Sequence, residues 1–324
     1  MQVKKSTEMI APTKTVIDPK RGRLGSLWKR IITNYELYLF LLPTLLYFTI
    51  FHYLPMYGMQ IAFKNYLPIK GILESPWVGF EHFERFFASY QFLTVLKNTL
   101  LINLYQLLLA FPIPIILALL LNQIGSTKFR RMVQTITYAP HFISVVVIVG
   151  MLYLFLSPMN GLLNNILGFL GIEPIFFMGE PGWFKSTFVF SGIWQNAGWS
   201  MIIYLAALSS VSPELHEAAI MDGASKFQRI VHIDLPAIMP TIMILLILDV
   251  GNFMALGFEK VYLMQNALNI DSSEVIQTYV YKTGLLNAQY SYATAVGLFN
   301  AIINFVLLIA MNQFAKKMKQ TSLF

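Results

Sequence analysis

The sequence has no cysteine among its 324 residues, which excludes disulfide bonds, thiolate metal sites and thiol catalysis. Charged residues make up only 12% of the chain, about half of what a soluble domain carries. No glycine is followed by lysine, so the phosphate-binding loop of nucleotide hydrolases is missing. The five histidines show no metal-ligand spacing, and the nucleophile motif of hydrolases is absent too. We therefore expect no catalytic residues, no metal site and no cofactor bound by this chain.

Apolar residues dominate instead, at 56% of the chain with a mean hydropathy of +0.60. A helix that crosses a membrane needs roughly 20 mostly apolar residues. Six segments meet or approach this requirement and predict an all-α membrane protein with six transmembrane helices. The longest loop between them contains a predicted interfacial helix over residues 81–87. The six segments cover residues 35–51, 99–121, 133–156, 187–209, 238–257 and 293–314.

Positive charge indicates the orientation, because cytoplasmic loops of membrane proteins carry an excess of lysine and arginine. With the N-terminus inside, sixteen of the 23 basic residues fall in cytoplasmic segments. Both termini are therefore predicted to be cytoplasmic. We expect a basic segment over residues 1–33, without the apolar core of a cleavable signal, and a transmembrane domain over residues 34–324 with a cytoplasmic loop at 210–236. The sixteen are Lys4, Lys5, Lys14, Lys20, Arg21, Arg23, Lys29, Arg30, Lys128, Arg130, Arg131, Lys226, Arg229, Lys316, Lys317 and Lys319.

The cytoplasmic loop between the fourth and fifth spans contains a polar, helix-forming stretch, HEAAIMDGASKFQRIVHIDLPAIMP, over residues 216–240. Ser212 is a good N-cap and Pro213 suits the first helical position. Glu217 falls near the positive end of the helix dipole, and Gly223 is expected to end or turn the helix. Such a helix suits contact with a soluble partner. The alternative is an ordinary amphipathic helix lying along the inner leaflet.

Seven positions of this loop match a known pattern: Glu-Ala-Ala, three residues, Gly, nine residues, then Ile-x-Leu-Pro. Here it reads Glu217-Ala218-Ala219, Gly223, Ile233 and Leu235-Pro236. The loop resembles the EAA loop of permease subunits of binding-protein-dependent ABC importers. The resemblance extends over roughly residues 30–324 to the branch that imports oligosaccharides and polysaccharide fragments. It is carried by YLPMYGMQIAFKNYLPIKGI (53–72), SPWVGF (75–80), YAPHFISVVV (138–147), IIYLAALSSVSPELHEAA (202–219) and QYSYATAVGLFN (289–300).

The resemblance implies a type I importer core of six transmembrane helices in the bacterial cytoplasmic membrane. It implies a second homologous permease subunit, two ATP-binding subunits that bind ATP and Mg, and an extracytoplasmic solute-binding protein that delivers the sugar. Acidic oligosaccharides such as alginate or uronate fragments are the first choice of substrate. The loop helix would dock on an ATP-binding subunit and transmit its closure to the spans. The residues expected to form this ATPase-docking surface are Glu217, Ala218, Ala219, Asp222, Gly223 and Phe227.

Polar residues inside the spans are candidates for the substrate pathway. Asp249 lies within the apolar run ILLILDVGNFMAL, and an ionisable group at that depth usually faces a cavity or a partner. Sugars need hydrogen bonds to their hydroxyls together with flat apolar surfaces. The alternative is that these side chains only bond neighbouring helices or, for the tryptophans, anchor the interface. The candidates are Trp194, Asn196, Trp199, Asp249, Asn252 and Asn300.

A different function remains open from the residues alone. An ion-coupled secondary transporter could use Asp249 as its proton or ion site. Such a transporter usually shows an internal repeat, and no convincing repeat relates the two halves of this chain. It also leaves the Glu217 loop unexplained. The spans contain no arginine or lysine that would neutralise an acidic sugar, so the source of any positive charge in the pathway is left open.

Overall fold

The computed structural model describes residues 32–318 and 321–322, so the predicted basic segment 1–33 lies almost wholly outside the described residues. The chain divides into two compact units, Met1–Gly58 and Met59–Phe324. The described part is mostly helical. In place of strands it has two isolated bridges, Lys64 with Trp77 and Leu67 with Gly71.

The first unit contains α2 (Tyr35–Phe48), the π-helical η1 (Thr49–Tyr53) and α3 (Leu54–Met56). The 3-10 helix η2 (Tyr57–Phe63) spans the division between the units. The second unit contains α4 (Gly71–Glu74), α5 (Glu81–Phe87), α6 (Gln91–Leu109), α7 (Pro112–Asn122), α8 (Thr127–Tyr138), η3 (Ala139–Phe142), α9 (Val145–Phe155), α10 (Leu162–Phe169), α11 (Pro181–Leu208), α12 (Pro213–Met221), α13 (Lys226–Arg229), η4 (Ile230–Asp234), α14 (Leu235–Gly251), α15 (Phe258–Met264), α16 (Ile270–Ser273), α17 (Ile276–Tyr281), η5 (Lys282–Leu286) and α18 (Tyr290–Lys317).

Four helical stretches are long and apolar enough to cross a membrane: Tyr35–Phe63, Gln91–Asn122, Lys226–Gly251 and Tyr290–Lys317. They contain the first, second, fifth and sixth predicted spans, except that residues 252–257 follow the end of the fifth helix. The fourth predicted span, 187–209, falls almost entirely within α11, a 28-residue helix that is not among these four. A helix is present over the predicted residues 81–87, as α5.

The third predicted span, 133–156, was wrong as a single helix. Its two parts, Thr127–Phe142 and Val145–Phe155, meet at an angle of 100°. Pro140 lies at the break and has no N–H to continue a helical ladder. Ser144 then starts α9 afresh, because its hydroxyl accepts a hydrogen bond from the Val147 N–H. Counted together, this bent pair would be a fifth span.

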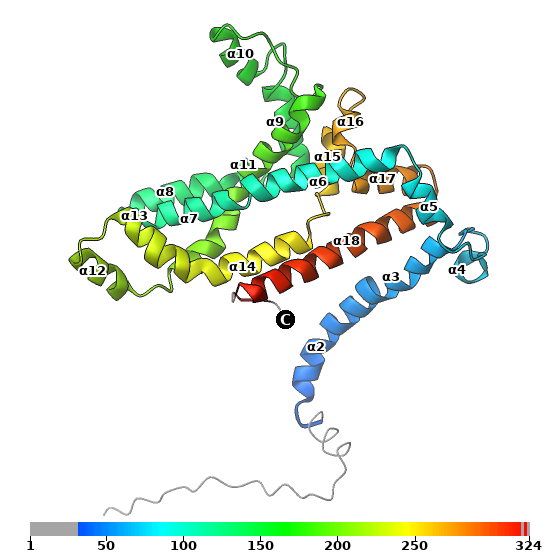
Figure 1. Cartoon of the computed structure of the whole chain (residues 1–324), viewed down its shortest axis with the longest axis horizontal. Helices are drawn as coiled ribbons and strands as arrows, with labels where there is room; N and C mark the ends of the chain where they lie inside the picture. The colour runs from blue at the N-terminus through cyan, green and yellow to red at the C-terminus, as the bar shows by residue number, and fades with distance from the viewer. Residues whose placement is uncertain (1–31, 319–320, 323–324) are drawn as a thin grey trace, which may run out of the picture. The chain divides into compact units, whose positions relative to one another are not determined.

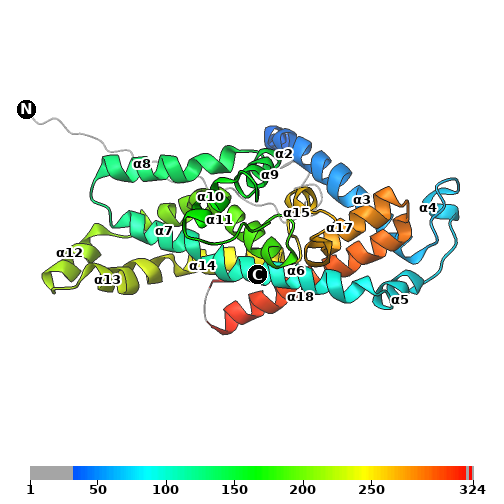
Figure 2. The same cartoon turned by 90° about the horizontal axis from the view of Figure 1, so that it is seen from above.

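Helix α11 is the central element of the second unit. Its N-terminal half shares an apolar core with α6, α9 and α15, through residues such as Phe188, Ile102 and Val261. Its C-terminal half shares another with α7 and α14, through Met201 and Ile238 among others. In both views α12 and α13 lie at one end of this unit and α5 lies at the opposite end (Figure 1) (Figure 2). Along the chain, helix α11 therefore connects residues 158–186, which the predicted orientation places outside, to the loop at 210–236, which it places in the cytoplasm.

Candidate functional site

The loop helix α12 is set up by local chemistry at both ends. The Ser212 hydroxyl accepts a hydrogen bond from the Glu214 N–H at 3.3 Å, and Pro213 occupies the first helical position. Gly223 has a φ of +79°, a left-handed conformation that favours glycine because it lacks a Cβ. The backbone bond from Ala224 N–H to Ala219 C=O, at 2.8 Å, closes this turn. The predicted N-cap and the predicted turn at Gly223 are both confirmed.

The residues predicted to dock on a partner lie on accessible parts of this loop. Leu215, Met221 and Phe227 are also exposed, and Phe227 has 73% of its surface accessible. Apolar side chains exposed beside acidic ones provide a surface that a protein partner can cover. Of the predicted docking residues, Ala219 is half-buried, whereas Glu217, Ala218, Asp222, Gly223 and Phe227 are exposed.

One buried carboxylate ties this loop to the helices behind it. Asp234, at the end of η4, is completely buried. Its Oδ2 accepts a hydrogen bond from the Gln123 side chain at 2.7 Å, just beyond α7. Nε2 of His216, on α12, lies 3.2 Å from Oδ1 of Asp234, at ion-pair distance but without hydrogen-bond geometry. Asp234 occupies the variable position between Ile233 and Leu235 of the loop pattern, so the pattern did not reveal it.

The break between α8 and α9 is held against α11 by several contacts. A side chain on Gly198 would collide with the Thr137 backbone carbonyl, so glycine allows α8 and α11 to touch. The Gln195 side chain donates to the Ile143 carbonyl at 3.1 Å, which satisfies an acceptor at the break. This contact fixes the corner of the broken span on α11.

A polar and aromatic cluster lies at the same corner. The His141 ring stacks on the Trp199 ring with centroids 4.6 Å apart and planes 5° from parallel. Nδ1 of His141 lies 3.1 Å from the Asn196 side-chain oxygen, at hydrogen-bond distance. The histidine spacing in the sequence did not single out His141. Its place beside Pro140, inside an otherwise apolar predicted span, was the signal available.

A cavity of about 650 Å³ opens beside this cluster, between the region of α6 and α7, helix α11 and the C-terminal part of α14. It brings together four of the six predicted pathway residues, Asn196, Trp199, Asp249 and Asn252, from two different helices. Hydrogen-bonding groups beside flat aromatic and aliphatic surfaces suit a sugar. The lining comprises Gln106, Ala110, Phe111, Pro114, Gly192, Ile193, Asn196, Ala197, Trp199, Ser200, Ile202, Ile203, Tyr204, Leu245, Leu248, Asp249 and Asn252.

The other two predicted pathway residues lie elsewhere. Trp194 lines an almost entirely apolar cavity of about 520 Å³ formed by α9, α10 and α11. Asn300 lines a third cavity, between α17 and α18, together with the small-residue stripe of Ala293, Gly297 and Ala301. The structure therefore separates the predicted set into three places and does not join Trp194 or Asn300 to the Asp249 cavity.

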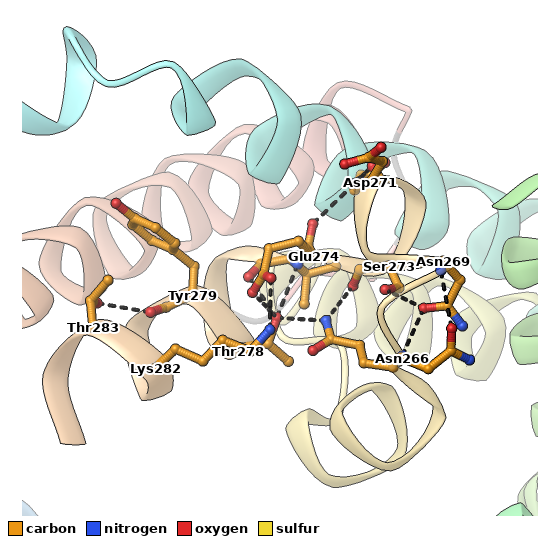
Figure 3. Close-up of polar contacts among 12 residues, drawn as sticks. Asn266, Asn269, Asp271, Ser273, Glu274, Thr278, Tyr279, Lys282 and Thr283 are labelled. Atoms are coloured by element: carbon orange, nitrogen blue, oxygen red, sulfur yellow. Dashed lines mark hydrogen bonds and ion pairs between the residues drawn. The ribbon is translucent and has the colours of Figure 1, made fainter. Parts of the chain in front are cut away.

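Residues 258–290, which the predicted orientation places outside, contain a polar network that connects the short helices α15, α16 and α17 (Figure 3). The Glu274 carboxylate pairs with Lys282 at 2.7 Å and accepts a hydrogen bond from Thr278 at 3.0 Å. The Asn269 side chain donates to the carbonyls of Met178 and Met264. Glu274 and Asn269 are both buried, so these contacts satisfy polar groups that burial would otherwise penalise. The network therefore joins α15, α16 and α17 to one another through satisfied polar contacts.

Comparison with known proteins places these features in context. The model of the family described as "Binding-protein-dependent transport system inner membrane component" matches residues 95–320. Protein LplB of Bacillus subtilis (strain 168) is 47% identical over 288 residues, covering 89% of this chain and 91% of that protein. The polygalacturonan/rhamnogalacturonan transport system permease protein YteP of the same organism is 43% identical over 320 residues, covering 99% of this chain and all of that protein.

Solved structures show the same likeness. A chain of a bacterial ABC transporter involved in the import of the acidic polysaccharide alginate superposes with a TM-score of 0.85 at 42% identity, covering 91% of this chain and 100% of the other. A chain of the bacterial alginate ABC transporter in complex with an alginate pentasaccharide-bound periplasmic protein has the same TM-score and identity, with 92% and 99% coverage.

Proposed function

The chain belongs to the family of binding-protein-dependent transport system inner membrane components, and on that premise we propose how it works as the permease subunit of an ABC importer for oligosaccharides. It lies in the bacterial cytoplasmic membrane with both termini inside. It pairs with a second homologous permease and with two ATP-binding subunits, which bind ATP and Mg. An extracytoplasmic solute-binding protein delivers the sugar, and this chain supplies no catalytic group.

The transmembrane domain crosses the membrane six times in this proposal. The four long apolar helices supply four crossings, the bent pair α8–α9 a fifth and α11 the sixth. At 1.5 Å per residue, the 28 residues of α11 extend for about 42 Å, more than the roughly 30 Å of the hydrocarbon core. Its serine, glutamine and asparagine residues lower its hydropathy, and a helix surrounded by protein tolerates them.

Helix α12 docks on an ATP-binding subunit through Glu217 and its exposed neighbours. The observation that supports this most is the tie between His216 on α12 and the buried Asp234 at the base of α14. A displacement of α12 by the partner would pull on Asp234 and on Gln123 beyond α7, and hence on two helices that line the cavity. The side chains of His216, Asp234 and Gln123 thus connect the docking helix α12 to the helices that line the cavity.

The sugar passes the cavity that contains Asn196, Trp199, Asp249 and Asn252. Amide and carboxylate groups bond the hydroxyls, and the indole face offers a flat surface to the ring. Acidic oligosaccharides are the first substrates to test, because YteP and the alginate transporter, at 43% and 42% identity, are described as handling acidic polysaccharides or polygalacturonan. Nothing in the comparisons favours ion-coupled transport through Asp249.

The coupling proposal is tested by Gly223→Asp in the assembled transporter. Gly223 has a positive φ and open space around it, so the substitution adds charge and bulk at the docking turn with little clash inside the chain. Gly171→Asp is the matched control, because Gly171 has a φ of +74° with equally open surroundings, outside this loop.

Copurification of the ATP-binding subunits and ATP-driven uptake of galacturonate oligosaccharides should both fall in Gly223→Asp and stay near wild type in Gly171→Asp. Equal behaviour of the two variants would contradict the docking role. Uptake driven by a proton gradient with the ATP-binding subunits left out would instead support the secondary-transporter alternative.

A further inference from the structure

Lys260 on α15 is a buried lysine held by a single acceptor. It is 9% exposed, and its Nζ donates to the Phe188 carbonyl at 3.1 Å. Nζ also lies 5.0 Å from the centre of the Phe188 ring, within range of a cation–π contact. An ammonium group has three donors, so this environment leaves part of its bonding capacity unused.

Lys260 also has no carboxylate partner in the described part of the chain. The contacts there at ion-pair distance join Lys282 to Glu274 and, when the histidine is protonated, His216 to Asp234. Burial lowers the pKa of Lys260 to about 8, because the ammonium loses hydration without gaining an opposite charge. A buried charge in this condition costs folding free energy, and an apolar side chain of the same length would fit more stably. Lys260 is therefore poorly explained as a stabilising residue.

The position of its ammonium connects Lys260 to the sugar cavity. Gly192 lines that cavity, and a Cβ at Gly192 would lie 3.4 Å from Nζ of Lys260. Since glycine has no side chain, nothing projects from this position between the ammonium and the cavity wall. The next turn of α11 carries Asn196, whose amide donates to the Gly192 carbonyl at 3.2 Å. The ammonium thus lies beside the wall that carries a proposed sugar-binding residue.

Charge in the cavity itself is of the opposite sign. Among the residues that line the cavity, Asp249 is the only aspartate, glutamate, lysine, arginine or histidine. Tyr204, another lining residue, is twelve positions from Gly192 on α11, about 18 Å along a helix. The cavity is thus long enough for a sugar carboxylate to approach the Gly192 end while other groups contact the rest of the lining.

We propose that Lys260 determines the preference of this permease for acidic oligosaccharides, by placing its ammonium where a sugar carboxylate passes Gly192. The inference rests on the proposed function, and it names the positive charge that the transmembrane segments lack. The carboxylate replaces the missing counter-ion, and a charge-assisted hydrogen bond forms. The lysine stem is flexible enough to turn its head toward the cavity. Burial without a partner keeps the ammonium ready for a substrate at the expense of stability.

The test uses the complete complex in proteoliposomes with its binding protein, and galacturonate trisaccharide as the probe. Its methyl ester is the neutral counterpart. Lys260→Met removes the charge at similar length. Gly192→Val keeps the charge but places a side chain over it. Lys282→Met is the control for loss of a lysine, because it leaves the buried Glu274 without its ion-pair partner and with only the hydrogen bond from Thr278.

In Lys260→Met, the half-saturating concentration for the acidic trisaccharide should rise about tenfold or more, as expected for loss of a charge-assisted bond. The value for the ester should stay unchanged, and the melting temperature should stay equal or rise. Gly192→Val, which adds bulk at the cavity wall, should raise the half-saturating concentration of the acidic trisaccharide more than that of the ester. Lys282→Met should instead lower the melting temperature. Both sugars meet the same binding protein, so its own preference cancels when a variant is compared with wild type.

Three outcomes overturn the inference. The first is wild-type uptake of the acidic sugar by Lys260→Met. The second is an equal loss for acid and ester together with a lower melting temperature, which would make Lys260 a structural residue. The third is a wild-type complex that imports only the ester. By contrast, a wild-type complex that imports neither sugar on ATP would contradict the proposed substrate class and not the role of Lys260 alone.

Discussion

Replacing His216 by alanine is predicted to weaken the coupling of ATP hydrolysis to sugar uptake. The Asp234 carboxylate is fully buried, and it is held from one side by Gln123 at 2.7 Å and from the other by His216 at 3.2 Å. Without His216, the carboxylate keeps its bond to Gln123 but loses its connection to α12. The loop helix could then move on the ATP-binding subunit without displacing α14.

The size of the effect of His216→Ala follows from the burial of His216 and Asp234. Removing one partner of a fully buried ion pair costs about 3–5 kcal/mol, whereas a solvent-exposed pair contributes about 0–1 kcal/mol. Asp234 retains Gln123, and the His216 side chain is 22% exposed, so water can replace part of what is lost. We expect the loss of His216 to destabilise the coupled arrangement of α12 and α14 by about 1–2 kcal/mol, which lowers the population of that arrangement roughly 5- to 30-fold.

The assay is the number of sugars imported per ATP hydrolysed in proteoliposomes. His232→Ala is the matched control, because His232 lies in the same loop, is exposed, and its Nδ1 lies 2.9 Å from the Gln228 carbonyl oxygen of its own helical turn. Hydrolysis should persist in His216→Ala while imported sugar per ATP falls, and His232→Ala should stay near wild type. The reasoning is refuted if His216→Ala keeps the wild-type ratio, or if both histidine variants lose it equally.

Three further predictions concern other parts of the chain. Asp249→Ala should reduce sugar uptake while the ATP-binding subunits still copurify, and unchanged uptake would exclude Asp249 from the pathway. Gly198→Ala should lower the free energy of unfolding by about 1–3 kcal/mol, because its Cβ would collide with the Thr137 carbonyl. Gly150→Ala is the control, because a Cβ there meets open space. Thermal melting should show a lower stability for Gly198→Ala and little change for Gly150→Ala. Burial lowers the pKa of Lys260 from 10.5 to about 8. Between these two pH values the unfolded chain binds more protons than the folded one, so the free energy of unfolding rises with pH. The rise is at most about 3 kcal/mol, at about 1.36 kcal/mol per pKa unit. Lys260→Met should remove this rise, and identical pH curves for variant and wild type would contradict it.

The helix and turn of the loop at 210–236 were predictable because their signals are local. A serine cap, a proline at the first helical position and a glycine that turns the chain act within a few residues of where they stand. The confirmed turn at Gly223 is such a case. The tie between His216 and Asp234 was not predictable in the same way, since it depends on the packing of α12 against η4, and no local rule places these residues together.

The pathway residues show a different limit. Asn196 and Trp199 are three positions apart, so they share a face of α11, whereas Trp194 points about 200° away from Asn196 around the helix. Helical periodicity alone would have separated Trp194 from the other two. The break at Pro140 was marked by proline followed by a serine cap, but the long apolar run outweighed these signals. The contacts of Lys260 and His141 needed the fold, because they join distant segments.

The bond from Gln195 to the Ile143 carbonyl bears on how the molecule can move. A break in a helix inside a bilayer would expose acceptors that lipid cannot satisfy, and here the Ile143 carbonyl accepts a hydrogen bond from a side chain of α11. Straightening the broken span would strand that carbonyl and separate His141 from Trp199. We therefore expect α8, α9 and α11 to travel together as one rigid body during transport. If the proposed transport involves bending, we expect it at other joints, such as Gly257, where the backbone has a φ of +69° between α14 and α15.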